Sequence, residues 1–115
     1  MTVHALAPYL PSALDAQLED WGPLPEATDQ PMATAGATLW EEGEASVGVW
    51  QCEAGPSRWK LETNELVHIL AGRLTITPDE GSEFTLAPGD VAFFPRGWCG
   101  AWQLHEPVRK VFAVF

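Results

Sequence analysis

Basic residues are scarce in this chain of 115 residues, which carries 6 Lys and Arg against 16 Asp and Glu, a formal net charge of −10. Nucleic acids and anionic membrane surfaces attract clustered Lys and Arg, so neither is an expected partner. No apolar run reaches the roughly 20 residues of a membrane-spanning helix. The sequence does not open with the basic and apolar segments of a signal peptide, and we expect a cytoplasmic protein.

Cysteine and histidine are also rare. Cys52 and Cys99 are too few for a disulfide framework or a zinc site, and we interpret them as reduced core thiols. The three histidines, His4, His68 and His105, are far apart in the sequence. No phosphate-binding Gly-rich loop, no CxxC motif and no G-x-S-x-G nucleophile elbow is present.

Proline and glycine, by contrast, are plentiful, with ten of each, and favour turns over long helices. From residue 39 onward, short apolar stretches alternate with turn signals such as Pro88-Gly89-Asp90 and Pro95-Arg96-Gly97. We expect eight strands, at residues 45–52, 58–61, 65–70, 73–77, 83–86, 91–94, 98–104 and 108–115. This spacing predicts an all-β fold, an antiparallel sandwich or a jelly-roll barrel.

The first 38 residues differ in character from the rest. Ser12 is expected to cap a short helix with one apolar stripe formed by Leu14, Leu18 and Trp21. The Pro-, Ala- and Thr-rich stretch 22–37 is expected to be an extended arm on the barrel, with disorder as the alternative. The predicted organisation is an N-terminal arm with a short helix, residues 1–38, followed by a β-barrel, residues 39–115.

Several short motifs occur in a characteristic order: Gly48-Val-Trp-Gln-Cys-Glu-Ala-Gly55, Asn64-Glu65, Ile69-Leu-Ala-Gly72, Pro88-Gly-Asp90, Phe94-Pro-Arg-Gly97, Trp102 and Val108-Arg-Lys110. Together they resemble the small single-domain cupins of the (S)-ureidoglycine aminohydrolase cupin-domain type, over about residues 36–115. The resemblance implies a cupin jelly-roll barrel and a homodimer. The family is named after an aminohydrolase that uses manganese held by His, Glu and Gln, so the resemblance also implies a possible enzyme of this kind.

The first motif of a typical metal cupin is G-x5-H-x-H-x3,4-E-x6-G. Counting back from Gly72 places Glu65 at the Glu position of this motif. The two His positions fall on Trp59 and Leu61, or on Arg58 and Lys60 with the longer spacer. Neither pair can ligate a metal in the manner of two histidines.

The second motif, G-x5-P-x-G-x2-H-x3-N, places its His on Gly100 and its Asn on Leu104. His68 cannot substitute, because residues three apart on a strand point to opposite faces and Glu65 then faces away from it. His105 stands in the same relation to Gly100. One of four expected ligands remains, so we expect no metal or other cofactor, with a divalent ion such as manganese as the less favoured alternative.

Glu65 is the candidate acid or base, and Lys110 is the candidate holder of an anionic substrate group. The alternatives are a structural pairing of Glu65 with Arg58, Lys60 or Lys110, and a surface position for Lys110. The candidate ligand-binding residues are Trp59, Leu61, Trp102, Arg58 and Lys60. The Trp rings either line an open lumen or fill it as core. Trp40 and Trp50 are expected outside the lumen.

Two functions therefore remain open. The first is a metal-free barrel that binds a small polar or nitrogenous metabolite. The second is an enzyme similar to (S)-ureidoglycine aminohydrolase, or another small-substrate enzyme, in which Glu65 is the acid or base and Lys110 holds a carboxylate. No activity can be assigned from the sequence, and a homodimer is expected in either case.

Overall fold

The computed structural model describes residues 8–115, which form ten strands and no helix. The strands are β1 (Glu19–Pro23), β2 (Ala33–Glu42), β3 (Ala45–Cys52), β4 (Gly55–Lys60), β5 (Glu65–Ala71), β6 (Leu74–Pro78), β7 (Phe84–Leu86), β8 (Val91–Phe94), β9 (Cys99–Leu104) and β10 (Val108–Val114). All eight strands predicted from the sequence are present. His4 and the start of the predicted arm lie outside the described residues.

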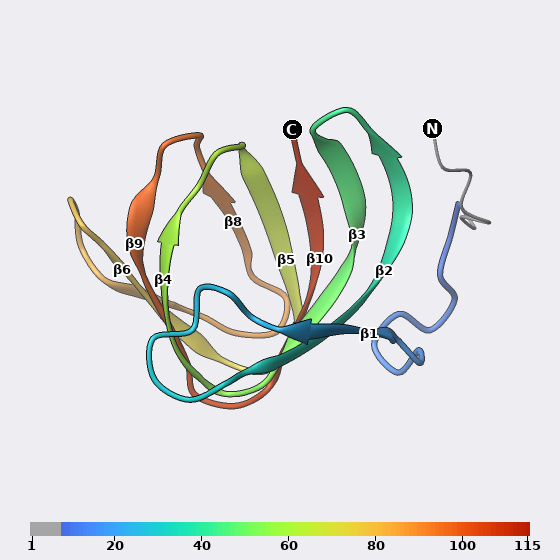
Figure 1. Ribbon diagram of the computed structural model, residues 1–115, viewed down its shortest axis with the longest axis horizontal. Helices are drawn as coiled ribbons and strands as arrows, with labels where there is room; N and C mark the ends of the chain where they lie inside the picture. Colours follow the sequence, from blue (N-terminus) through green and yellow to red (C-terminus); the bar gives the residue numbers. More distant parts are fainter. Residues whose placement is uncertain (1–7) are drawn as a thin grey trace.

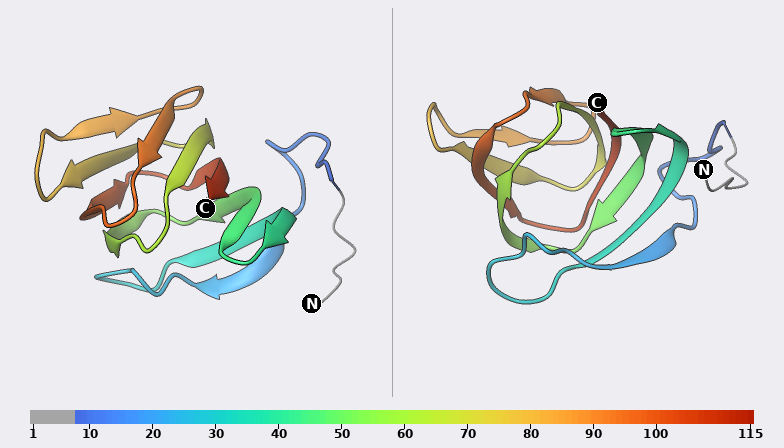
Figure 2. Two further views of the ribbon diagram at one scale, coloured as in Figure 1. Left: turned by 90° about the horizontal axis from the view of Figure 1, so that it is seen from above. Right: turned by 45° about the horizontal axis from the view of Figure 1, so that its top comes forward.

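The strands form two antiparallel sheets that face each other (Figure 1). The larger sheet has the order β1-β2-β3-β10-β5-β8, and the smaller has the order β4-β9-β6-β7. The expected jelly-roll architecture is confirmed, and the strands of the two sheets surround a common interior (Figure 2). The two sheets remain separate in their strand pairing, so they do not close into the predicted barrel. Between β4 and the segment that follows β1, only an isolated bridge joins Ala27 to Ser57 among the described residues.

The chain passes between the sheets at tight turns. Gly72 follows β5 in the larger sheet and precedes β6 in the smaller one, at a φ of 89°. A Cβ at this position would also collide with the backbone of Pro107 and Val108. Only glycine tolerates both conditions, so this turn fixes where β5 ends and β6 begins.

The predicted N-terminal helix is wrong. Residues 11–15 form a single turn, in which the carbonyl of Ser12 accepts hydrogen bonds from the N–H groups of Asp15 and Ala16. Ser12 itself has a φ of 54°, outside the helical region. A short isolated helix is costly to nucleate, whereas residues 19–23 gain hydrogen-bond partners by pairing with β2. Strand β2 also runs across residue 38, where the arm was expected to end.

The core lies between the two sheets. Its fully buried side chains are mainly aliphatic and aromatic, and they come from both sheets and from the segment after β1: Met32, Cys52, Val67, Ile69, Leu74, Ile76, Phe94, Trp102, Leu104 and Val108. Strand β5 shows the alternation clearly, since Glu65, Val67 and Ile69 are buried while Leu66 and His68 are exposed. Glu65 and His68 therefore face opposite sides, as predicted.

The two cysteines are free, but they differ in environment. Cys52 is buried in the core as expected, whereas Cys99 is only half-buried. Burial raises the pKa of the Cys52 thiol to about 11, and the nearby charge of Lys110 offsets part of this effect. We predict that a thiol reagent at pH 8 titrates Cys99 in the native protein and Cys52 only after unfolding. Rapid reaction of both thiols in the folded protein would contradict this assignment.

Candidate functional site

The buried interior contains one acidic and one basic side chain, which form an ion pair. Glu65 begins β5, and Lys110 lies in the middle of the neighbouring strand β10. The Nζ atom of Lys110 donates a hydrogen bond to Oε2 of Glu65 at 2.7 Å, and the two side chains are only 5% and 9% exposed. Of the pairings left open by the sequence, the structure shows the one between Glu65 and Lys110.

Two indole rings enclose the ammonium group. The Nζ atom of Lys110 lies 4.4 Å from the ring centroid of Trp50 and 4.5 Å from that of Trp102. Trp50 is the register partner of Lys110 on β3, so it projects from the same face. The expectation that Trp50 lies outside the interior is therefore wrong. Cation–π contacts of this kind stabilise a charge that has been removed from water.

Aromatic rings extend this cluster into the smaller sheet. Trp102 on β9 packs against Trp59 on β4, with ring centroids 4.5 Å apart, and against Phe94 on β8 at 5.2 Å. The hydroxyl of Ser57 accepts a hydrogen bond from Nε1 of Trp59 and donates one to the carbonyl of Trp102. Trp102 Nε1, in contrast, is buried and has no hydrogen-bond partner in the described part of the chain. Leu61 is buried beside this cluster.

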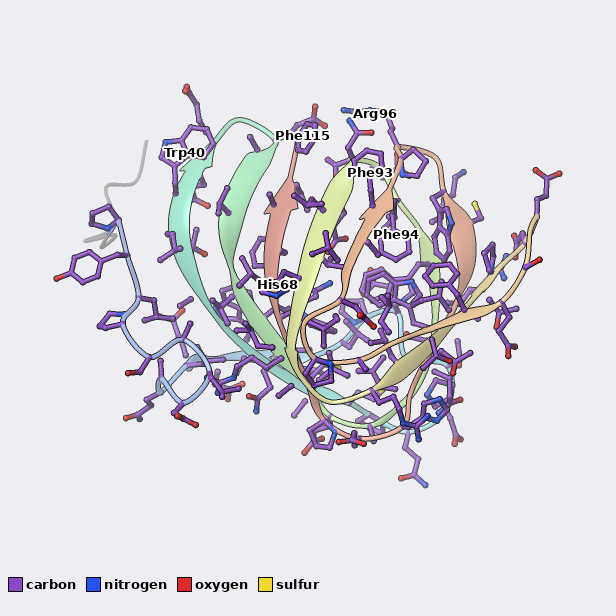
Figure 3. The ribbon with its side chains drawn as sticks, turned by 180° about the vertical axis from the view of Figure 1, so that it is seen from behind. Trp40, His68, Phe93, Phe94, Arg96 and Phe115 are labelled. Atoms are coloured by element: carbon purple, nitrogen blue, oxygen red, sulfur yellow. The ribbon has the colours of Figure 1, made fainter. Side chains whose placement is uncertain are left out.

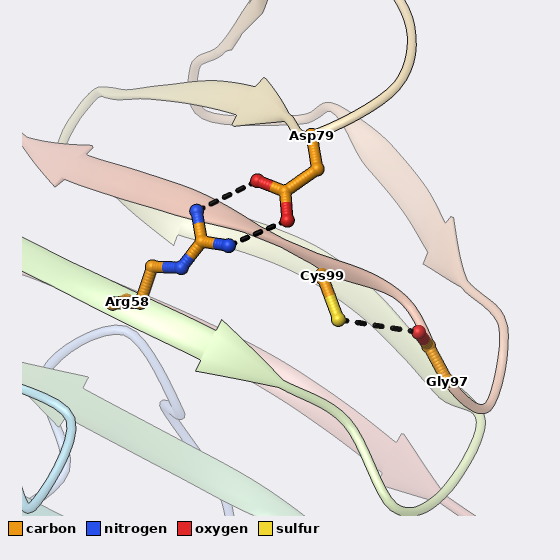
Figure 4. Close-up of polar contacts among 4 residues, drawn as sticks. All are labelled: Arg58, Asp79, Gly97 and Cys99. Carbon is orange, nitrogen blue, oxygen red and sulfur yellow. Dashed lines mark hydrogen bonds and ion pairs between the residues drawn. The ribbon is translucent and has the colours of Figure 1, made fainter.

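The structure thus brings together five of the seven candidate residues, in or beside one interior cluster: Glu65, Lys110, Trp59, Leu61 and Trp102. Arg58 and Lys60 are exposed and lie on the other face of β4. Figure 4 shows Arg58 forming a two-pronged ion pair with Asp79, at 2.7 and 2.5 Å. This hydrogen-bonded pair lowers the pKa of Asp79 and leaves Arg58 turned away from Glu65.

The residues at the cupin metal positions do not fit a metal ion. Glu65, the one carboxylate there, is engaged by Lys110. Within residues 8–115, no group of three or more His, Cys, Asp and Glu side chains is arranged to hold a metal. Gly100 is also closely packed, because a Cβ built on it would lie 2.6 Å from the carbonyl oxygen of Thr77 and 2.6 Å from the Trp98 ring. The space of the usual third histidine is therefore occupied by protein atoms.

This packing predicts that Gly100→Ala destabilises the protein by about 1–3 kcal/mol, because one methyl group must displace a neighbouring strand or the Trp98 ring. Urea unfolding followed by Trp fluorescence measures the effect. The control is Ala101→Ser, a small substitution at the next residue of the same strand. Gly89→Ala would not serve as a control, because the positive φ of Gly89 would itself strain an alanine. Equal stability of Gly100→Ala and the native protein would show that the site has spare room.

The chain matches a known protein family over most of its length. Residues 39–112 match the model of the EutQ-like cupin domain, which covers more than half of the sequence. The chain belongs to the EutQ-like cupin family. The prediction of a small cupin is therefore confirmed at the level of the cupin domain, but the match does not identify the (S)-ureidoglycine aminohydrolase type. No curated protein sequence matches the chain significantly.

Solved structures share the fold of this EutQ-like cupin. A protein of unknown function from Pseudomonas syringae pv. tomato superimposes with a TM-score of 0.80 over 89% of this chain, at 23% identity, and the chain spans 46% of that protein. A Thermotoga maritima protein is 34% identical, with a TM-score of 0.56 over 58% of this chain and 76% of its own. The EutQ protein of Clostridium difficile is 17% identical, with a TM-score of 0.63 over 73% of this chain and 68% of its own.

Sequence reasoning missed two residues of the cluster, Trp50 and Trp98. The signal for Trp50 was its parity, because it lies two residues before the buried Cys52 on a strand. Trp98 precedes β9 and packs edge-on against Phe94, with centroids 5.0 Å apart. The position of Trp98 depends on the turn at Gly97, and the alternation of side chains along a strand does not predict positions in a turn.

Residues 8–115 contain no helix that could cross a membrane.

Proposed function

We propose that this cupin binds a small polar, nitrogen-containing metabolite in its interior without a metal, at the Glu65–Lys110 pair. The observation that carries the proposal is a buried ion pair enclosed by Trp50 and Trp102. A buried ion pair adds little to stability compared with apolar residues of the same volume. The presence of this ion pair in a mainly apolar core therefore favours a role in recognition.

The hydrogen-bonding capacity of the cluster favours a particular ligand chemistry. Glu65 accepts hydrogen bonds, Lys110 has further N–H donors beyond the one given to Glu65, and Nε1 of Trp102 is a donor without a partner among the described residues. A ligand with adjacent N–H and C=O groups, such as an amide or a ureido compound, matches these groups. The flat indole rings suit the planar faces of such a ligand.

Binding of N-carbamoylglycine, which carries a ureido group and a carboxylate, tests the proposal. Isothermal titration with the native protein, in the presence of EDTA, is expected to show saturable binding. Trp102→Phe keeps an aromatic ring but removes the N–H donor, and it is expected to weaken binding about tenfold, as for the loss of one hydrogen bond. Arg58→Gln, on the exposed outer face, is the matched control and should bind normally. Binding that requires an added metal, or that is equal in Trp102→Phe, would refute the proposal.

A second candidate is an enzyme of the (S)-ureidoglycine aminohydrolase kind, or another small-substrate enzyme. The specific observation in its favour is the 2.7 Å contact of Glu65 with Lys110, which provides a proton acceptor and a proton donor side by side. Here Glu65 would act as acid or base, and Lys110 would hold a substrate carboxylate. Loss of turnover with retained binding in Glu65→Gln would support the enzyme, whereas binding without turnover in the native protein supports the first proposal.

A further inference from the structure

A pocket opens on the surface between the β6–β7 hairpin and the β8–β9 turn. Its volume is about 410 Å³, within the range of roughly 300–1,000 Å³ that is usual for small-molecule sites. The two segments lie on the same side of the molecule (Figure 1). Figure 3 shows the β8–β9 turn at one end of the sheet, marked by Arg96, with Phe94 nearer the interior. Residues from both segments line the pocket: Pro78, Asp79, Glu80, Gly97, Trp98 and Cys99.

Trp98 gives the pocket an aromatic wall. The side chain is half-buried, and its ring is held in place because it packs edge-on against Phe94, with centroids 5.0 Å apart. A Cβ built on Gly100 would lie 2.6 Å from the Trp98 ring, so the ring also fills the space beside that glycine. Pro78 adds a second apolar surface. An indole ring fixed in this way is a preformed contact surface for a cation.

Glu80 gives the pocket its net negative charge. The carboxylate of Asp79 is already engaged, because both of its oxygens accept hydrogen bonds from the guanidinium of Arg58 (Figure 4). Glu80 is exposed and forms no hydrogen bond or ion pair within residues 8–115. Lys60, the register partner of Cys99 on β4, does not line the pocket. The pocket therefore favours a cation and disfavours an anion.

The other polar groups of the pocket are largely engaged within the protein. The carbonyl oxygen of Gly97 accepts a hydrogen bond from the Cys99 thiol, and the carbonyl oxygen of Cys99 accepts one from the N–H group of Asp79. Of these groups, only the Glu80 carboxylate is left for a primary ammonium, which has three N–H donors. A quaternary ammonium group has no N–H donors, so it needs only a negative charge and an aromatic surface.

We propose that this pocket binds a small organic cation of the quaternary ammonium type. The Trp98 ring contacts the ammonium group, and the Glu80 carboxylate neutralises its charge. The 16 acidic side chains of the chain, against 6 Lys and Arg, also attract cations to the surface. This site goes beyond the interior site proposed above and does not depend on it, because neither Glu65 nor Lys110 lines the pocket.

Choline and its neutral isostere, the alcohol in which a tert-butyl group replaces the trimethylammonium group, test the proposal. Isothermal titration of the native protein at low ionic strength is expected to show saturable binding of choline. The neutral alcohol is expected to bind about tenfold more weakly, because it makes neither the cation–π contact nor the ion pair. Absence of saturable choline binding, or equal binding of the two compounds, would overturn the proposal.

Two variants assign the binding to the lining residues. Glu80→Gln, at an exposed position, is expected to weaken choline binding about threefold, as for the loss of one exposed ion pair. Glu83→Gln removes the same charge from the same hairpin, but Glu83 hydrogen-bonds to Thr77 and does not line the pocket, so this control should bind choline normally. Trp98→Leu keeps an apolar side chain without the ring and is expected to weaken binding about tenfold.

Trp98 also packs against the core, so Glu80→Gln decides the question if Trp98→Leu fails to fold by circular dichroism. Native affinity for choline in folded Glu80→Gln would overturn the proposal.

The Cys99 thiol reports where the cation binds. Cys99 lines the pocket, whereas Cys52 is buried, so alkylation of the folded protein by iodoacetamide measures access to the pocket. Saturating choline is expected to slow alkylation of Cys99 severalfold, because the bound cation covers the thiol, and the neutral alcohol at the same concentration should not. Choline that binds without slowing this reaction would place the cation elsewhere and contradict the proposal.

Discussion

Replacement of Lys110 by methionine is expected to lower the free energy of unfolding by about 3–5 kcal/mol. The substitution keeps most of the side-chain volume but leaves the Glu65 carboxylate in the interior without its partner at 2.7 Å. It also removes the charge that lies over the Trp50 and Trp102 rings. Urea unfolding of the native and variant proteins at neutral pH measures the loss.

The double variant Glu65→Leu with Lys110→Met distinguishes the ion pair from simple packing. An apolar pair of similar volume removes both desolvated charges, so it is expected to recover most of the stability lost in Lys110→Met. Lys60→Met, on the exposed face of β4, is the control for loss of a lysine charge and should change stability little. A Lys110→Met protein as stable as the native protein would show that Glu65 reaches water without Lys110.

Trp102→Ala is the second substitution with a large expected effect, a loss of about 3–5 kcal/mol. The Trp102 side chain is 1% exposed, and its ring contacts Trp59, Phe94 and the ammonium of Lys110. Its removal would leave a cavity between the two sheets, because the rigid strands can collapse only in part. Thermal and urea unfolding measure the loss.

The matched control for this aromatic deletion is Tyr9→Ala, because Tyr9 is 67% exposed. It should change the free energy of unfolding by less than about 0.5 kcal/mol, as is usual for surface substitutions. Equal stability losses in the two variants would contradict the assignment of Trp102 to the centre of the core.

Strand positions and side-chain parity could be predicted from the sequence because both depend on local patterns. The strand pattern of residues 65–70 is visible in the sequence, and the alternation of side chains along a strand is enough to place Glu65 and His68 on opposite faces. Glycine and proline mark the turns, since positive φ at residues such as Gly72 and Gly89 is a local requirement. The inward position of Trp102 and Leu104 followed from the same reasoning.

Features that depend on distant partners were not predictable in the same way. Residues 19–23 form a strand because β2 lies beside them, and the apolar spacing of Leu14, Leu18 and Trp21 gives no sign of that pairing. The choice of Lys110 over Arg58 and Lys60 as the partner of Glu65 depends on which strands are neighbours. Whether the sheets close into a barrel depends on pairing between their edge strands, β1 and β8 in the larger sheet and β4 and β7 in the smaller, and this pairing has no distinct sequence signal.

Glu65 forms an ion pair with Lys110 in the interior of this cupin, and we propose that it therefore binds no metal ion. Elemental analysis of protein purified without chelator, combined with thermal unfolding with and without EDTA and added manganese, tests it most directly. We predict far less than one transition-metal ion per chain and the same unfolding temperature under all conditions. A stoichiometric ion whose removal lowers the unfolding temperature, and which is lost in Glu65→Gln, would contradict the claim.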